Sequence, residues 1–235
     1  MGSVGPTAQL SVPAVGAARH TCAVLDLVLP LECGGCGAPS TRWCAACGSE
    51  LALSVDAPRV VTPRIDPGVP VFALGRYAGA RRRAIVAMKD RGRADLQAPL
   101  ARSLALGVHR LLLWGLLDVP LTIVPAPTRG WSARHRGGDP VTRIATLATA
   151  GHPGLTVARA LRMTAWARDS AGLNSAARER NIAGRVRLTR RRLPRRGELL
   201  VVDDIVTTGA TARESLRVLH RSGARVSAVL ALAAA

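Results

Sequence analysis

The chain has 235 residues, with 48% hydrophobic and 20% charged side chains, which excludes a wholly disordered protein and leaves room for one α/β domain with a small appendage. The formal net charge is +18, and almost every basic residue is arginine. Such an excess favours polyanionic partners, either nucleic acid or small phosphates, although a bias of composition would give the same charge without any partner. No apolar run is long enough to cross a membrane and the N-terminus lacks a secretion pattern, so we expect a cytoplasmic protein that binds no membrane.

Four regions follow one another along the chain. Residues 1–20 lack hydrophobic periodicity and are expected to be a disordered tail. Residues 21–53 hold the cysteines and are expected to form a small metal-binding element, and the proline-rich stretch 54–70 is expected to be a linker. Residues 71–235 alternate between strand and helix patterns and form the main predicted domain.

The alternation in the main domain predicts βαβ units, and therefore a mostly parallel sheet flanked by helices. The expected strands are 69–77, 121–125, 155–161, 198–202 and 225–233. The expected helices are 80–90, 95–117, 139–150, 173–182 and 208–222, the last of them ended by Gly223. The arginine-rich stretch 184–196 has two interpretations, a solvated hairpin or a track for a nucleic-acid backbone.

The most informative segment is 199–211, LLVVDDIVTTGAT, in which an apolar strand ends in Asp203 and Asp204 and a short turn then opens a helix. A helix N-terminus attracts a phosphate, and Gly209 allows a close backbone approach. Two carboxylates would repel that phosphate unless they face hydroxyl donors or a magnesium ion. A ligand with a 5′-phosphate and a free ribose 2′,3′-diol satisfies both halves of the motif.

This segment resembles the signature of type I phosphoribosyltransferases, which bind 5-phosphoribosyl 1-pyrophosphate (PRPP). The resemblance implies that Asp203 and Asp204 hold the ribose hydroxyls. It also implies a 5′-phosphate loop made of Val206, Thr207, Thr208, Gly209, Ala210 and Thr211. By the same resemblance, Mg²⁺ bridges the ligand oxygens while a nitrogen nucleophile displaces pyrophosphate from the ribose.

Over residues 22–233 the layout resembles the ComF family of competence protein F-like proteins, on the strength of Tyr77, the segments 88–92, 123–137 and 161–181, and the four-cysteine element. The resemblance implies a pyrophosphate loop at Ala126, Pro127, Thr128 and Arg129, and a closing loop, 163–181, whose contacts are Arg178 and Asn181. The sequence departs from the family at 136–140, which reads RGGDP where RGFNQ is usual, and at Ser170, which stands in place of a glutamine.

No acceptor pocket or general base is evident in the sequence, so catalysis stays open. We expect a phosphoribosyltransferase, with two alternatives. One is a PRPP sensor without turnover. The other is an accessory protein that binds single-stranded DNA through the arginine-rich stretch.

The cysteines Cys33, Cys36, Cys44 and Cys47 have the spacing C-x₂-C-x₇-C-x₂-C. Four thiolates on two tight turns predict a closed tetrahedral Zn²⁺ site, which is structural because no coordination position is left for a substrate. The weaker alternatives are an iron–sulfur cluster and disulfides, and Cys22 receives no role.

Overall fold

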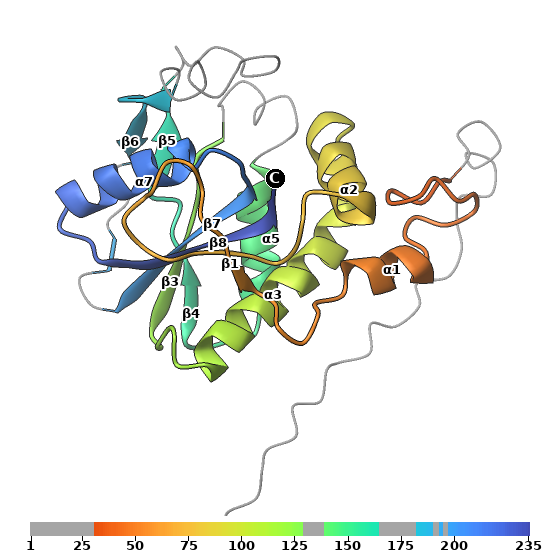
Figure 1. Cartoon of the computed structure of the whole chain (residues 1–235), viewed down its shortest axis with the longest axis horizontal. Helices are drawn as coiled ribbons and strands as arrows, with labels where there is room; N and C mark the ends of the chain where they lie inside the picture. Colours follow the sequence, from red (N-terminus) through yellow and green to blue (C-terminus); the bar gives the residue numbers. More distant parts are fainter. Residues whose placement is uncertain (1–30, 129–138, 165–181, 190–192, 195–196) are drawn as a thin grey trace, which may run out of the picture.

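The computed structural model describes residues 31–128, 139–164, 182–189, 193–194 and 197–235. Its centre is a six-stranded sheet in the order β1-β2-β8-β7-β3-β4, in which every neighbouring pair is parallel except β1 and β2 (Figure 1). A separate antiparallel pair, β5-β6, lies beside α7. The strands of the main sheet are β1 (Arg59–Val60), β2 (Val71–Ala73), β3 (Leu121–Pro125), β4 (Leu155–Val157), β7 (Glu198–Val206) and β8 (Val226–Ala234), and those of the pair are β5 (Leu161–Met163) and β6 (Val186–Leu188).

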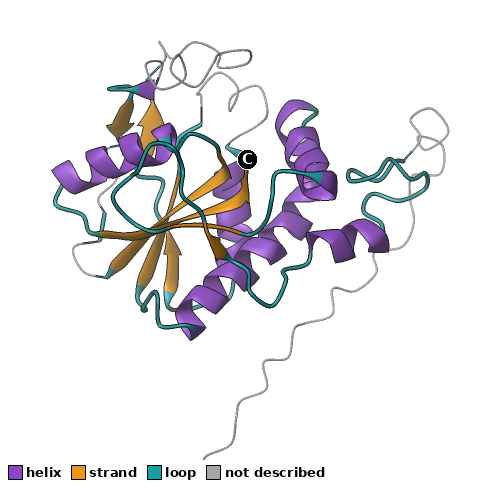
Figure 2. Cartoon of the chain, viewed as in Figure 1, coloured by secondary structure: helices purple, strands orange, loops and turns teal. Residues whose placement is uncertain are grey.

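Helices cover both faces of the main sheet (Figure 2). One face carries α2 (Gly79–Asp90), α3 (Gln97–Leu113) and α5 (Pro140–Thr149), and the other carries α7 (Ala210–Arg221). The 3₁₀ helix η1 (Ala94–Leu96) precedes α3, and α1 (Ala45–Leu51) of the cysteine element packs against α2 and α3. The predicted α/β fold, a mostly parallel sheet flanked by helices with an N-terminal four-cysteine cluster, is confirmed.

The central strand β7 explains why its sequence is a continuous apolar run. Leu200 and Val202 face the layer of α2, α3 and α5, whereas Leu199 and Val201 belong to the core beneath α7, and all four are buried. A strand covered on both faces needs apolar side chains at every position, which is typical of parallel sheets. Few aromatic side chains take part, as the composition predicts.

Glycines end two of the helices. Gly115 takes a φ of 64°, and the N–H of Leu116 donates to the carbonyl of Leu111 at 2.9 Å, which closes α3 at Leu113. The observed helix therefore ends four residues before the C-terminal end of the expected helix 95–117, and the first residues of the expected helix belong to η1. Gly223, with a φ of 80°, ends α7 in the same way and confirms the prediction made for it.

Several strands differ from the expectation. The expected strand 155–161 is divided between β4, which extends the main sheet, and β5, which pairs with β6 from the arginine-rich stretch. β2 is shorter than 69–77, and β7 continues to Val206, so the acid pair lies within the strand. The segment predicted as a linker contains β1. The expected tail 1–20 and most of the expected helix 173–182 fall outside the described residues.

Within the described part of the chain, no helix has both the length and the apolar character needed to cross a bilayer.

Candidate functional site

The loops that follow β3 and β7 leave the same edge of the sheet in opposite directions. These strands are parallel neighbours, and their register pairs Pro125 with Val202. From β3 the chain crosses over one face through α5 to β4, and from β7 it crosses over the other face through α7 to β8. Such a switch point opens a crevice at the carboxyl ends of the strands, where open α/β sheets bind their ligands.

Asp203 and Asp204 lie in β7 at this edge. Asp204 is 4% exposed and Asp203 is half-buried. The backbone N–H of Asp204 donates to Oδ1 of Asp203 at 2.8 Å, which fixes the first carboxylate beside the strand. Because side chains alternate along a strand, the two acids point to opposite faces of the sheet.

Lys89, in the last turn of α2, reaches across to this acid pair. Its Nζ lies 2.5 Å from Oδ2 of Asp204. Burial alone would lower the pKa of Lys89, but the negative charges of Asp204 and Asp203 raise it above its ordinary value. The ammonium therefore stays charged and balances one of the two carboxylates.

Asp203 has the opposite environment. Its burial and the repulsion from Asp204 raise its pKa to about 7, and Asp139 adds to that rise, while Lys89 opposes it. A carboxyl group near neutrality can accept a hydrogen bond from a ligand hydroxyl once it is ionised. It can also donate one while it is protonated.

The turn after β7 is held in shape from outside. Gly209 has a φ of 85°, and a Cβ added there would lie 2.3 Å from the carbonyl oxygen of Ile65. The N–H of Ile65 in turn donates to the carbonyl of Thr208 at 2.8 Å. The turn delivers the chain into α7, whose first N–H groups lack partners within the helix and suit an anion. The structure thus brings the predicted loop residues, 206–211, together directly after the acid pair.

The loop after β3 begins beside strand β7. The N–H of Ala126 donates to the carbonyl of Val202 at 2.7 Å, and Ala126 and Pro127 are buried. The hydroxyl of Thr128 donates to Oδ1 of Asp139 at 3.1 Å. The predicted contacts Arg129, Arg178 and Asn181 lie outside the described residues.

Two residues with a place in this site were given no role from the sequence. Asp139 caps α5 by accepting the N–H groups of Val141 and Thr142, each at 3.2 Å, and its charge acts on Asp203. Lys89 was quoted in the family resemblance without a function. The available signal for Lys89 was that it is the single lysine of an arginine-rich chain.

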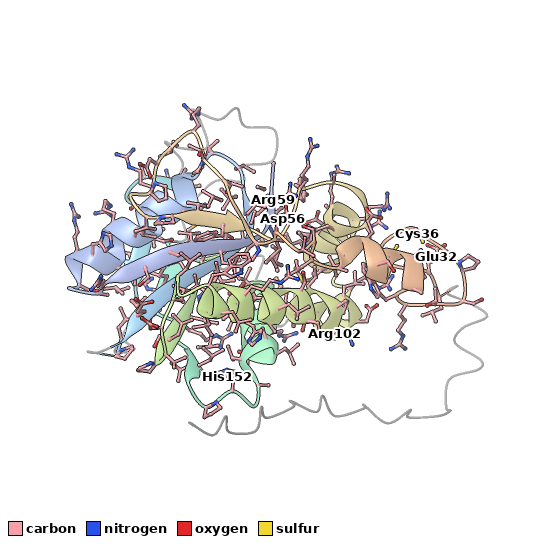
Figure 3. The ribbon with its side chains drawn as sticks, turned by 60° about the horizontal axis from the view of Figure 1, so that its bottom comes forward. Glu32, Cys36, Asp56, Arg59, Arg102 and His152 are labelled. Atoms are coloured by element: carbon pink, nitrogen blue, oxygen red, sulfur yellow. The ribbon has the colours of Figure 1, made fainter. Side chains whose placement is uncertain are left out.

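The four cysteines of the N-terminal element converge. Their sulfur atoms all lie within 4.8 Å of one another, and Cys33 and Cys47 are buried. A tetrahedral zinc ion with Zn–S bonds of about 2.3 Å separates its ligand sulfurs by roughly 3.8 Å, so the cluster is compatible with structural zinc. Cys36 is the exposed member of the set and is labelled in Figure 3.

Backbone groups around the cluster suit thiolates. The N–H groups of Gly35 and Cys44 donate to the sulfur of Cys33, each at 3.4 Å. A side chain at position 35 would clash, because its Cβ would lie 2.4 Å from the sulfur of Cys47. Packing therefore requires a glycine at position 35.

The helix α2 connects the cysteine element to the acid pair. Near its start, the buried Arg81 donates to the carbonyls of Leu51 in α1, at 3.0 Å, and Leu232 in β8, at 3.2 Å. The N–H of Ala80 donates to Glu50 of α1 at 2.6 Å. At the other end of the same helix is Lys89.

Comparison with known proteins adds nothing to this geometry. No family model matches the chain, and no curated protein matches it.

Proposed function

We propose that the protein binds PRPP at the switch point between β3 and β7 and transfers its phosphoribosyl group to an acceptor. The observation that carries the proposal is the acid pair of β7 followed at once by the glycine turn into α7. The carboxylates of Asp203 and Asp204 are suited to the ribose hydroxyls, and the turn ending at Gly209 is suited to the 5′-phosphate. The resemblance to the ComF family points to the same ligand.

The reaction makes few chemical demands on the side chains. A nitrogen of the acceptor forms a bond to C1 of the ribose while the C1–O bond breaks, and pyrophosphate leaves with the bonding electrons. The transition state resembles an oxocarbenium ion, so the protein's part is to orient the ribose and exclude water. A magnesium ion bound with the ligand would supply positive charge that neutralises the leaving pyrophosphate. The family resemblance implies that the loop after β3, of which the structure describes Ala126, Pro127 and Thr128, would contact that group.

The test is calorimetric titration of the full chain with PRPP and Mg²⁺. The double variant Asp203→Asn/Asp204→Asn removes both charges at the site, and Asp118→Asn, an exposed residue outside the site, is the matched control. We expect binding by the wild type and the control and none by the double variant. A folded wild type that binds no PRPP would overturn the proposal. If binding is found, pyrophosphate release with a panel of nitrogen acceptors tests turnover.

We also propose that the four cysteines bind Zn²⁺ as a structural ion. Four protein ligands close the coordination sphere, so no position is left for a substrate. A segment as short as 31–53 buries little apolar surface by itself, and the metal would supply part of its folding free energy.

A second candidate function is binding of single-stranded DNA, and one groove favours it. The groove lies between segment 64–68 and α7, and its basic lining consists of Arg64, Arg213, Arg217 and His220. Glu214 holds Arg217 through two hydrogen bonds, at 2.6 and 2.7 Å, which reduces the charge available to a backbone. In anisotropy titrations, the affinity for a labelled oligonucleotide should fall steeply as salt is added, and it should also fall in Arg213→Ser. Affinity indifferent to both would dismiss this candidate.

A further inference from the structure

The chain carries 33 lysine and arginine residues, and among those that the structure describes, Lys89, the single lysine, forms an ion pair with Asp204 of the acid pair. The side chain of Lys89 is 30% exposed, whereas that of its partner Asp204 is 6% exposed. An ammonium has three N–H groups, and one carboxylate oxygen uses one of them. Lys89 can therefore maintain its ion pair with Asp204 and still donate a hydrogen bond to a ligand oxygen. An arginine whose planar guanidinium pairs with a carboxylate does this less readily.

Lys89 and the phosphate turn lie on different sides of the sheet edge. The turn leads into α7, which covers one face, whereas Lys89 comes from α2 on the other face. Asp203 and Asp204, pointing to opposite faces, lie between them. A single phosphate at the turn is separated from the ammonium by the acid pair. A ligand that engages both must therefore carry a second anionic group beyond its ribose.

We propose that Lys89 forms a second anion subsite, which binds the diphosphate at C1 of the ribose while the turn holds the 5′-phosphate. This inference rests on the proposed function and adds Lys89 to the residues that bind its ligand. Tyr77 lies close enough to act electrostatically on Lys89. The ammonium also offsets the repulsion between the diphosphate and the two acids, which would otherwise oppose binding.

A single lysine makes this subsite directly observable. Biosynthetic labelling with lysine carrying ¹³C at Cε gives one side-chain signal in the full-length protein, and Lys89→Arg removes it. With Mg²⁺ present, we expect PRPP and inorganic pyrophosphate to shift this signal, and ribose 5-phosphate to leave it in place. A signal that stays unmoved while calorimetry detects PRPP binding would overturn the subsite and leave the proposed function standing.

Affinities of variants separate ligand contact from simple support of Asp204. In Lys89→Met, we expect the affinity for PRPP to fall at least tenfold and that for ribose 5-phosphate to change less than twofold. Lys89→Arg should restore part of the PRPP affinity, and Arg91→Met, which removes an exposed charge two residues away, should change neither ligand's affinity. Equal losses for both ligands would mean that Lys89 only positions Asp204, and the subsite would be rejected.

The two proposals fail in different ways. A shift with pyrophosphate in a protein that binds no PRPP would support the anion subsite and overturn the phosphoribosyl proposal. If the Lys89 signal does not shift with pyrophosphate and calorimetry detects no binding of PRPP, both proposals are overturned.

Discussion

The backbone of Ile65 supports the turn at Thr208, because its N–H donates to the carbonyl of Thr208 at 2.8 Å while its own carbonyl lies against Gly209. Segment 63–65 therefore occupies the space that any side chain at position 209 would need. The turn that we assign to the phosphate is thus shaped by a segment distant in sequence. This relationship gives a direct prediction for the glycine.

Gly209→Ala should lower the free energy of unfolding by about 2–4 kcal/mol, since it adds a steric clash to the cost of a positive φ. The new Cβ would lie 2.3 Å from the Ile65 carbonyl oxygen and 2.9 Å from Pro63. Urea unfolding measures the loss, and calorimetry measures the accompanying loss of PRPP affinity. The matched control is Gly223→Ala, which has a similar φ of 80° but no atom within 4 Å of its Cβ. It should cost about 1 kcal/mol and leave ligand binding intact. Equal effects of the two variants would contradict the role given to Ile65.

Titration of Asp203 predicts how stability depends on pH. Its pKa of about 7 in the folded protein lies above the ordinary value of 3.8, because of burial and of the charge of Asp204. The folded state thus holds a proton that the unfolded chain has already released, so this group's contribution to stability is complete below pH 3.8 and falls as pH rises to about 7. One pKa unit corresponds to about 1.4 kcal/mol, so the loss is a few kcal/mol at most.

Urea unfolding at several pH values between 4 and 8 checks this dependence. Among the described residues, the charges of Asp204, Asp139 and Lys89 act on Asp203. In Asp203→Asn the decline of stability with pH should flatten, because the amide that replaces the carboxyl group does not titrate. Asp118→Asn should keep the wild-type profile. A wild-type profile in Asp203→Asn would assign the decline to other groups.

Local patterns made the acid pair and the turn predictable. An apolar strand, two acids, small hydroxyl residues and a glycine are neighbours in sequence, and their arrangement follows from the chain's local geometry. The same holds for Gly223, which ends its helix by hydrogen bonds to the preceding turn. The parallel sheet followed from the alternation of strand and helix.

Contacts between distant segments were beyond local patterns. Lys89 meets Asp204 only because the fold brings the last turn of α2 near the acid pair of β7, and a lysine at the end of a helix is ordinarily solvated. Asp139 departs from the family pattern, so the resemblance gave it no role. The pairing of β5 with β6 was missed because β6 is short and lies among arginines, although its Val186 is buried.

Arg81 is expected to hold the cysteine element against the main domain. Its guanidinium is buried and donates to carbonyls in α1 and β8, and burial lowers its pKa. Arg81→Met would leave these carbonyls without their donor, so we expect a loss of about 2–4 kcal/mol in the free energy of unfolding. Limited proteolysis should then cut more readily between Leu51 and Arg59.

Arg102→Met is the control for this change. Arg102 lies on the exposed side of α3 (Figure 3), and its replacement removes the same charge without a buried hydrogen bond. It should change the free energy of unfolding by less than about 0.5 kcal/mol. Similar stabilities of the two variants would mean that Arg81 adds nothing to the docking of the element.

Loss of zinc should destabilise the region that the cysteines organise. A thiol reagent combined with a zinc indicator should release one zinc ion per chain from the wild type and less from Cys36→Ser, because four thiolates complete the proposed site. The melting temperature of Cys36→Ser should be roughly 10 °C below that of the wild type, since the metal supplies several kcal/mol of the element's folding free energy. Cys22→Ser, which leaves the four-cysteine motif intact, should retain both the zinc and the stability. Full zinc binding by Cys36→Ser would contradict the proposed ligand set. Visible absorption from bound iron in the wild type would indicate an iron–sulfur centre on the same four sulfurs in place of zinc.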